Sequence, residues 1–325
     1  VFTPFSKAFR ATHVVDAPLG APQHMPPFPS SFPVPTEPLP TLEELGLTRN
    51  AGIQRGGEAY AHQRLSTFLS NGLDSYHEHR DRMDLPGTSR VSADLKFGTL
   101  SPRQVWHAVQ NVGGQPAGRF AYLNELIWRE FSHSTLWDQP DLLTTPFRPA
   151  WAEFPWREDE AAWDAWIHGH TGYPIVDAAC RQLLASGFVH NRARMISASF
   201  LTKHLMIDYK RGADHYLKWL TDGDWAQNIA GWQWSAGCGV DAQPYFRVFN
   251  PMSQGKKFDP KGDYVRKWVP ELRDLPAKYI HEPWSAPPLI LASHGITLGS
   301  TYPHPIVDHA TARKRFLAEA KAFLS

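Results

Sequence analysis

Apolar residues recur at helical spacing along most of this chain, and few stretches alternate between apolar and polar residues as a half-buried strand would. In the segment 56–73, four apolar residues between Ala59 and Leu69 follow this spacing, and Asn71-Gly72 comes after them as a stop signal. Further helices are predicted over residues 101–111, 117–136, 159–168, 173–186, 191–209, 211–221 and 308–323. The pattern therefore predicts an all-α fold.

Proline is concentrated between Pro18 and Pro40, where nine prolines occur. Each one fixes its backbone angle and lacks an N–H group, so this density excludes helix and central strand and favours an extended path. We therefore divide the chain into a linker or wrapping arm at residues 1–45 and a large helical domain at residues 46–325. The opening residues 1–5, VFTPF, read like the middle of a longer protein, and we expect that a segment upstream is missing.

Charge and cysteine content limit the classes of protein that this chain can represent. The 33 Lys and Arg against 32 Asp and Glu leave a formal charge of +1, so any affinity for nucleic acid must come from local basic clusters. Two cysteines, Cys180 and Cys238, supply neither a disulfide framework nor a zinc site, and we expect no metal. The sequence has no apolar run of about 18 residues and no secretory signal. These features predict a cytoplasmic protein that does not enter a membrane.

Two motifs in the first half of the chain could bind an anionic or planar ligand. Residues 87–92, GTSRVS, combine hydroxyls, backbone amides and a cation that suit a phosphate, although a capped turn without a ligand is the simpler interpretation of these residues alone. In the helix predicted at 117–136, Glu125, Trp128 and Arg129 are spaced to share one face. They could hold a stacked, hydrogen-bonded ligand, or form a surface ion pair beside a core tryptophan.

Three motifs in the second half combine amides, charges and aromatic rings. Residues 190–195, HNRARM, begin a predicted helix and suit either phosphates and base edges or plain exposure to solvent. Residues 222–228, DGDWAQN, fit a helix N-cap rather than a calcium loop, because the Glu that closes an EF-hand loop is missing. In residues 231–237, GWQWSAG, two tryptophans bracket a glutamine, which suits a stacking site and close packing equally well.

Seven motifs in this order resemble the photolyase and cryptochrome superfamily over essentially the whole chain, and most closely its class I cyclobutane pyrimidine dimer photolyases. They are GTSRVS, LIWREF, TGYPIVDAACRQL, HNRARM, DGDWAQN, GWQWSAG and DAQPYFRVFNP. The resemblance implies a monomeric lyase that repairs cyclobutane pyrimidine dimers in DNA, by light-driven electron transfer from reduced FAD to a flipped-out dimer. It also implies an N-terminal antenna domain that this chain lacks, so no antenna chromophore can be assigned.

The resemblance assigns one set of residues to the FAD. Those expected to hold the cofactor are Tyr76, Thr88, Ser89, Arg90, Val91, Ser92, Tyr122, Arg129, Arg194, Asp222, Asp224 and Asn228. Within this set, Asn228 would face flavin N5, and Arg194 would pair with Asp222. Tyr122 stands where many relatives have Trp. Asn rather than Asp at position 228 resembles the repair enzymes rather than the plant-type cryptochromes.

A second set would bind the damaged DNA. The dimer would lie between Trp128 and Trp234, with Glu125 and Asn191 hydrogen-bonded to its bases and Met195 against its apolar side. Relatives that repair (6-4) photoproducts have histidines at positions 191 and 195, which disfavours that substrate. Contacts with the DNA backbone or the opened duplex are expected from Arg80, Arg192, Arg247, Gln254 and Lys257.

The resemblance also assigns residues to electron transfer. Relatives use three tryptophans between flavin and surface, and the matching positions here are Trp232, Tyr209 and Trp156. Together with Glu125, Asn191 and Asn228, these three form the predicted catalytic set. Because tyrosine oxidation normally requires loss of the phenolic proton, we expect light-driven reduction of FAD to be slowed or rerouted, with Trp219 or Trp225 as substitutes.

Two other functions stay open at this stage. A cryptochrome-like photoreceptor would bind FAD and signal through a partner without repairing DNA. A helical nucleic-acid-binding module that has lost its flavin would be colourless after gentle purification.

Overall fold

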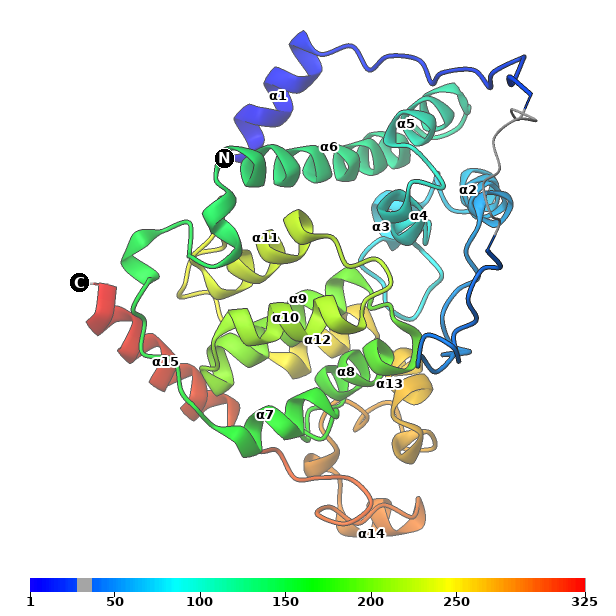
Figure 1. Ribbon diagram of the computed structural model, residues 1–325. Helices are drawn as coiled ribbons and strands as arrows, with labels where there is room; N and C mark the ends of the chain where they lie inside the picture. The colour runs from blue at the N-terminus through cyan, green and yellow to red at the C-terminus, as the bar shows by residue number, and fades with distance from the viewer. Residues whose placement is uncertain (28–36, 325) are drawn as a thin grey trace.

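The computed structural model describes residues 1–27 and 37–324, and every regular element in this part of the chain is a helix (Figure 1). One isolated β-bridge, between Leu298 and Tyr302, is the single β pairing among the described residues. The predicted all-α fold is confirmed for this part of the chain.

The helices are distributed along both halves of the chain. The first half contains α1 (Phe2–Thr12), α2 (Glu58–Asn71), α3 (Tyr76–His79), α4 (Ser92–Phe97), α5 (Pro102–Asn111) and α6 (Pro116–Asp138). The second half contains α7 (Glu160–Ile167), α8 (Pro174–Ser186), α9 (Asn191–Ser199), α10 (Tyr209–Trp219), α11 (Trp225–Ala236), α12 (Pro251–Phe258), α13 (Asp263–Trp268), α14 (Pro288–Ser293) and α15 (His309–Leu324). Short 3-10 turns lie at Pro140–Leu143, Pro149–Trp151, Pro270–Leu272 and Pro283–Ser285.

The single helix predicted over 191–209 is wrong. The α-helix ends at Ser199 and continues as a π-helix over Phe200–Leu205. Met206 then adopts a left-handed conformation with φ +58, which turns the chain. A new helix begins after Asp208, whose side chain accepts a hydrogen bond from Lys210 N at 2.9 Å. The apolar pattern runs through this break, so periodicity alone cannot reveal it.

The proline-rich arm contains a helix that the sequence interpretation missed. In α1, Pro4 lies in the first turn, where a missing N–H group costs nothing. Residues 13–27 and 37–40 form no helix, in agreement with the expected extended path, and residues 28–36 lie outside the described residues. The division into an arm and a domain at residue 46 stays a prediction. Helices α3, α4, α11, α12, α13 and α14 were also missed.

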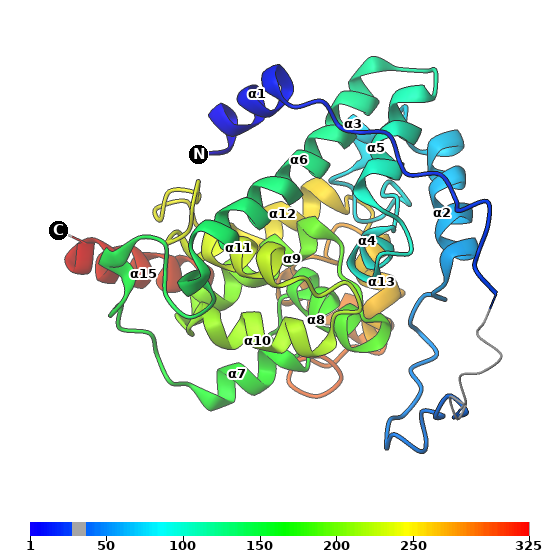
Figure 2. The same cartoon turned by 45° about the horizontal axis from the view of Figure 1, so that its top comes forward.

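Helix α8 lies at the centre of the main hydrophobic core. Nine of its 13 residues are buried, so it can be solvent-exposed only along a narrow stripe. It packs against α9, α13, α12 and α7, and the core continues into α10 and α11. A smaller cluster lies beneath α2, α3 and α5, and α6 contacts both that cluster and α11 (Figures 1 and 2). Helix α6 therefore connects the two halves of the protein.

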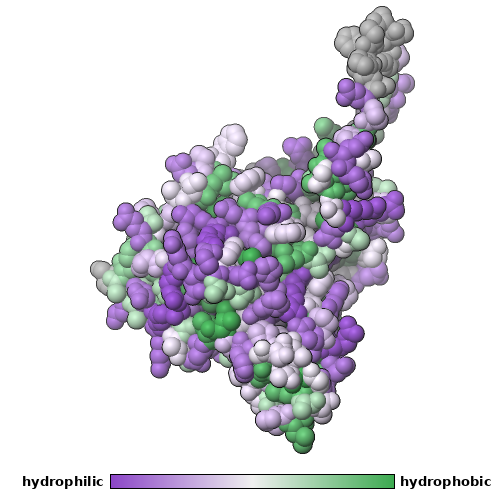
Figure 3. Space-filling model, turned by 60° about the horizontal axis from the view of Figure 1, so that its bottom comes forward, coloured by the Kyte–Doolittle hydropathy of each residue, from purple (hydrophilic) through white to green (hydrophobic). Residues whose placement is uncertain are grey.

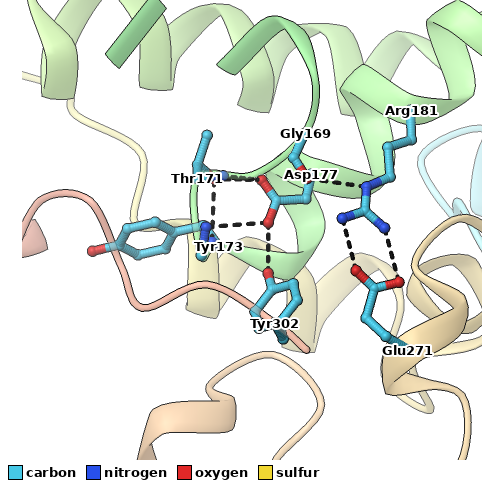
Figure 4. Close-up of polar contacts among 8 residues, drawn as sticks. Gly169, Thr171, Tyr173, Asp177, Arg181, Glu271 and Tyr302 are labelled. Atoms are coloured by element: carbon cyan, nitrogen blue, oxygen red, sulfur yellow. Dashed lines mark hydrogen bonds and ion pairs between the residues drawn. The ribbon is translucent and has the colours of Figure 1, made fainter. Parts of the chain in front are cut away.

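A buried carboxylate anchors α8 to the C-terminal part of the chain (Figure 4). Asp177 is fully buried and accepts hydrogen bonds from Thr171 N at 2.7 Å, Thr171 Oγ1 at 2.6 Å, Gly172 N at 3.2 Å and Tyr302 OH at 2.6 Å. One turn along, Arg181 forms an ion pair with Glu271 at 2.7 Å. These contacts satisfy a charge that would otherwise be costly to bury, and they fix the loop before α8.

Hydrophilic residues cover most of the face shown in Figure 3, and hydrophobic residues appear there in small separate groups. Among the helices of the described residues, none has the length and apolar character needed to cross a membrane.

Candidate functional site

A cavity of about 590 Å³ opens between α6, α9 and α11. This volume falls within the range of about 300–1,000 Å³ that small-molecule sites occupy. Its lining comes from four separate stretches of the chain, at residues 76–92, 125–142, 188–198 and 216–240. The fold therefore brings together motifs that are far apart in the sequence.

An ion pair crosses one side of the cavity. The guanidinium of Arg194, on α9, donates to both carboxylate oxygens of Asp222 at 2.7 and 2.8 Å, and its Nε donates to Val189 O at 2.8 Å. Asp222 is buried, so the pair is held in one geometry and satisfies both charges. The predicted pairing of Arg194 with Asp222 is present in the structure.

Asp224 has two roles at the start of α11. Its side chain accepts from Gln227 N at 2.9 Å, which is the N-cap arrangement that the sequence favoured over a calcium loop. His133, on α6, lies 3.2 Å from the other carboxylate oxygen. Burial alone would raise the pKa of Asp224, but the hydrogen bonds from His133 and Gln227 outweigh it and lower the pKa to about 2. Asp224 therefore carries its charge beside the cavity at neutral pH.

The loop before α4 presents hydroxyls and a cation to the cavity. Thr88, Ser89, Arg90 and Ser92 all line it, and Tyr122 OH donates to Ser89 Oγ at 2.9 Å. Arg90 adopts a left-handed backbone with φ +59, and its guanidinium lies 3.6 Å from the centre of the Phe188 ring. Within the described residues Arg90 forms no ion pair, and burial lowers its pKa. A half-buried cation in this condition suits an anionic ligand.

The mouth of the cavity combines two half-buried tryptophans with a carboxylate. Trp128 comes from α6 and Trp234 from α11. Glu125, one turn before Trp128, forms a close ion pair with Arg80. Asn191 lies at the start of α9, with its amide nitrogen 3.7 Å from Met195 Sδ. Flat apolar rings beside hydrogen-bonding groups suit a ligand with planar, polar-edged rings.

Trp232 lines the cavity and leads into a group of buried aromatic rings. Its ring centroid lies 5.1 Å from that of Tyr216 and 6.0 Å from that of Trp166. Trp166 stacks in turn on the half-buried Trp163, with centroids 5.5 Å apart. Tyr209 is also buried, and its ring lies 6.3 Å from that of Trp156.

Comparison with known proteins gives this geometry a family. The sequence profile described as the FAD binding domain of DNA photolyase matches residues 122–322. The chain is 46% identical to a deoxyribodipyrimidine photo-lyase of Escherichia coli, over 82% of this chain and 56% of that protein. The chain belongs to the DNA photolyase FAD-binding family.

Solved structures of photolyases and cryptochromes have the same fold. A bacterial class III photolyase from Agrobacterium tumefaciens matches with a TM-score of 0.89 and 41% identity, over 99% of this chain and 68% of that one. A cryptochrome of Synechocystis sp. PCC6803 matches with a TM-score of 0.87 and 32% identity, over the same shares of both chains. This photolyase-family chain spans about two thirds or less of the length of the relatives it matches.

The cavity fits the FAD that the family binds. Arg90 and the hydroxyls of Thr88 and Ser92 can hold its phosphates, while the ring of Trp232 offers a planar apolar surface. Asn228 donates its amide N–H to Ala213 O at 3.0 Å, which fixes the amide group and leaves its oxygen as a possible acceptor.

The structure gathers most of the predicted site residues around this cavity. Those that line it are Tyr76, Arg80, Thr88, Ser89, Arg90, Val91, Ser92, Glu125, Trp128, Asn191, Arg192, Arg194, Met195, Asp222, Asp224, Asn228, Trp232 and Trp234. Seven predicted residues are absent from the described lining: Tyr122, Arg129, Trp156, Tyr209, Arg247, Gln254 and Lys257. Their assigned roles, like those of the first group, stay predictions.

Two residues that the sequence interpretation did not single out hold the site together. Gln233 accepts from Phe147 N and donates to Leu142 O and Thr145 O, each at 2.9 Å, so the glutamine between the two tryptophans is structural. Gly212, on α10, packs directly against the indole of Trp232. An isolated helical glycine gives no signal of such a contact before the two helices are placed together.

We predict that Gly212→Ala destabilises the protein and displaces Trp232. A Cβ atom at this position would overlap the indole and approach Leu201. Overpacking of this kind costs about 1–3 kcal/mol, which outweighs the gain of up to about 1 kcal/mol in helix propensity. Denaturant unfolding measures the free-energy change.

Gly231→Ala is the matched control, because this glycine is also helical but has no neighbouring atom within 4 Å of the added Cβ. We expect it to keep or raise the free energy of unfolding. Equal effects of the two substitutions would contradict a specific contact at Gly212.

Proposed function

We propose that this protein repairs cyclobutane pyrimidine dimers in DNA, using light and reduced FAD. The observation that carries the proposal is the shared cavity, in which groups suited to FAD adjoin a mouth formed by Trp128, Trp234 and Glu125. Cofactor and substrate could therefore meet inside one enclosed site. The names of the curated relatives, deoxyribodipyrimidine photo-lyases, support the same reaction.

A dimer within a duplex cannot reach the interior of this cavity, so it must be flipped out of the helix. Photolyases are named in general accounts of base flipping, whose cost is a few kcal/mol and is lower for a damaged base. Stacking on aromatic rings can return about 1–3 kcal/mol per base, which Trp128 and Trp234 are placed to supply. Reduced FAD would supply the light-excited electron that opens the cyclobutane ring.

Glu125 is the residue best placed to stabilise the reacting dimer. Burial raises the pKa of its carboxyl group, while the nearby Arg80 acts in the opposite direction. A carboxyl group held close to its protonated form can donate a hydrogen bond to a base carbonyl whose negative charge grows after electron transfer. Arg80 and Arg192 are then available to contact phosphates at the mouth.

We propose the class I photolyases as the group within the family, on the seven ordered motifs. The class III structure from Agrobacterium tumefaciens is the competing assignment. A tree of complete sequences that grouped this chain with class III enzymes would overturn the class assignment and leave the repair proposal untouched. Asn191 and Met195 at the cavity mouth support a cyclobutane dimer rather than a (6-4) photoproduct.

A cryptochrome-like photoreceptor is the second candidate, because the Synechocystis cryptochrome shares this fold. Such a protein would bind FAD without repairing DNA. In either case we infer that the protein acts where DNA is held in the cell, and a monomeric state stays a prediction.

The decisive test of the proposal is repair under blue light. The FAD-loaded protein is reduced, mixed with a thymine-dimer oligonucleotide and illuminated, and the return of nucleobase absorbance is followed. We predict light-dependent repair that Glu125→Ala lowers about tenfold or more, because hydrogen bonds to charged groups contribute about 1.5–3 kcal/mol.

Glu130→Ala is the matched control for Glu125, since Glu130 lies on the same helix outside the cavity lining and pairs with Arg129 at 3.3 Å. It should repair at the native rate. A flavin-bound protein that restores no absorbance would favour the photoreceptor, and a colourless protein that binds no FAD would favour a nucleic-acid-binding module.

We further propose that electrons reach the cavity by a route that avoids Tyr209. Its hydroxyl is buried and has no hydrogen-bond partner in the described part of the chain, and burial raises its pKa. Oxidation of a phenol requires an acceptor for its proton, so Tyr209 is a poor relay. Trp166, in ring contact with both Trp232 and Trp163, is better placed than the substitutes expected from sequence, Trp219 and Trp225.

We predict that Tyr209→Phe leaves the photoreduction rate of bound FAD nearly unchanged, whereas Trp166→Phe slows it. Transient absorption after blue excitation measures the growth of the tryptophan radical signal. Trp225→Phe, which removes an exposed indole, serves as the control and should behave like the native protein. Loss of the radical signal in Tyr209→Phe alone would restore the relay role that the resemblance implies.

A further inference from the structure

We propose that Phe2 of α1 is a positioning residue that sets the orientation and spacing of Trp128 and Trp234, the two tryptophans at the cavity mouth. The inference rests on the proposed function, because the spacing matters only if a flipped-out dimer enters between these rings. Phe2 itself does not line the cavity among the described residues. It acts from behind the two walls.

The first contact is with the wall that α6 provides. The rings of Phe2 and Trp128 are stacked, with centroids 3.6 Å apart and an angle of 4° between their planes. Phe131, one turn further along α6, meets Phe2 edge-on at 5.8 Å. Phe2 is only 8% exposed, so its ring is confined on both sides. With one face held by Phe2, Trp128 has its other face free for the cavity.

The second contact is with the wall that α11 provides. The backbone N–H of Phe2 donates to Asp241 Oδ2 at 3.3 Å. Asp241 lies a few residues beyond the end of α11, which carries Trp234. Its neighbour Val240 lines the cavity and also packs against the Phe2 cluster. One residue thus touches the supports of both tryptophans.

Helix α1 is built to hold Phe2 in this place. Phe2, Phe5 and Phe9 fall at spacings of three and four, so they share one face, and that face packs on α6 (Figure 1). Phe5 contacts Phe131 at 5.2 Å, and Phe9 contacts Trp106 at 5.8 Å. The far end of α1 is therefore attached to α6 independently of Trp128.

This arrangement has a consequence for selectivity between damaged and undamaged DNA. Undamaged duplex meets the protein mainly through phosphate contacts, which do not depend on the mouth. A flipped-out dimer needs both tryptophans at stacking distance. Loss of the Phe2 ring should therefore weaken binding of dimer-containing DNA and leave binding of undamaged DNA as it was.

The experiment measures binding of a thymine-dimer duplex and of the undamaged duplex of the same sequence, at one salt concentration, with the full FAD-loaded chain. We expect Phe2→Ala to weaken dimer binding about three- to tenfold, the scale of an aromatic pair contact. Flavin content and repair yield at saturating DNA should not change, because only the binding step is affected. Phe2→Tyr, which keeps the flat ring, should restore native binding.

Phe9→Ala is the matched control, because it weakens the packing of α1 without touching Trp128. It should keep the native preference for damaged DNA. If Phe2→Ala fails to fold, Phe2→Leu removes the flat ring with less loss of volume, and Asp241→Ala removes the second contact. Native selectivity in these variants would overturn the inference. A native protein without any preference for dimer DNA would overturn the proposed function as well.

Discussion

The candidate site depends on the close approach of α10 and α11 at Gly212. Because this residue has no side chain, the indole of Trp232 can lie against the backbone of α10. That contact fixes the register of α11 and places Asn228, one turn earlier, on the cavity side. Asp224 caps the same helix and adds a charge at its start. A single small residue thus determines where several lining groups lie.

The charged and aromatic parts of the cavity occupy different places, and the proposed reaction needs both. Arg194 and Asp222 neutralise one another, while Arg90 remains as a cation without a carboxylate partner in the described part of the chain. Trp128 and Trp234 lie at the mouth with few charges of their own beyond Glu125 and its partner. An anionic cofactor and an apolar, base-like substrate are therefore matched by different surfaces within one enclosure.

Sequence reasoning predicted the helices that are long and periodic, including α6 and α8. It failed where a local backbone feature decides the structure, as at Met206, whose left-handed turn divides one periodic stretch into two helices. It also missed α11, whose packing on Gly212 is a tertiary property. Most proposed site residues could be named from the family motifs, and 18 of them line the cavity, yet Phe2 and Gln233 act through contacts that no motif announces.

The central claim is that this cavity binds FAD, and an equilibrium titration of the flavin-free protein with FAD tests it most directly. The account predicts saturation at one FAD per chain, with strong quenching of flavin fluorescence because Trp232 lines the site. Replacement of Trp232 by Phe should leave the stoichiometry unchanged and recover part of the fluorescence. A titration without saturation, or saturable binding without any quenching, would contradict the account.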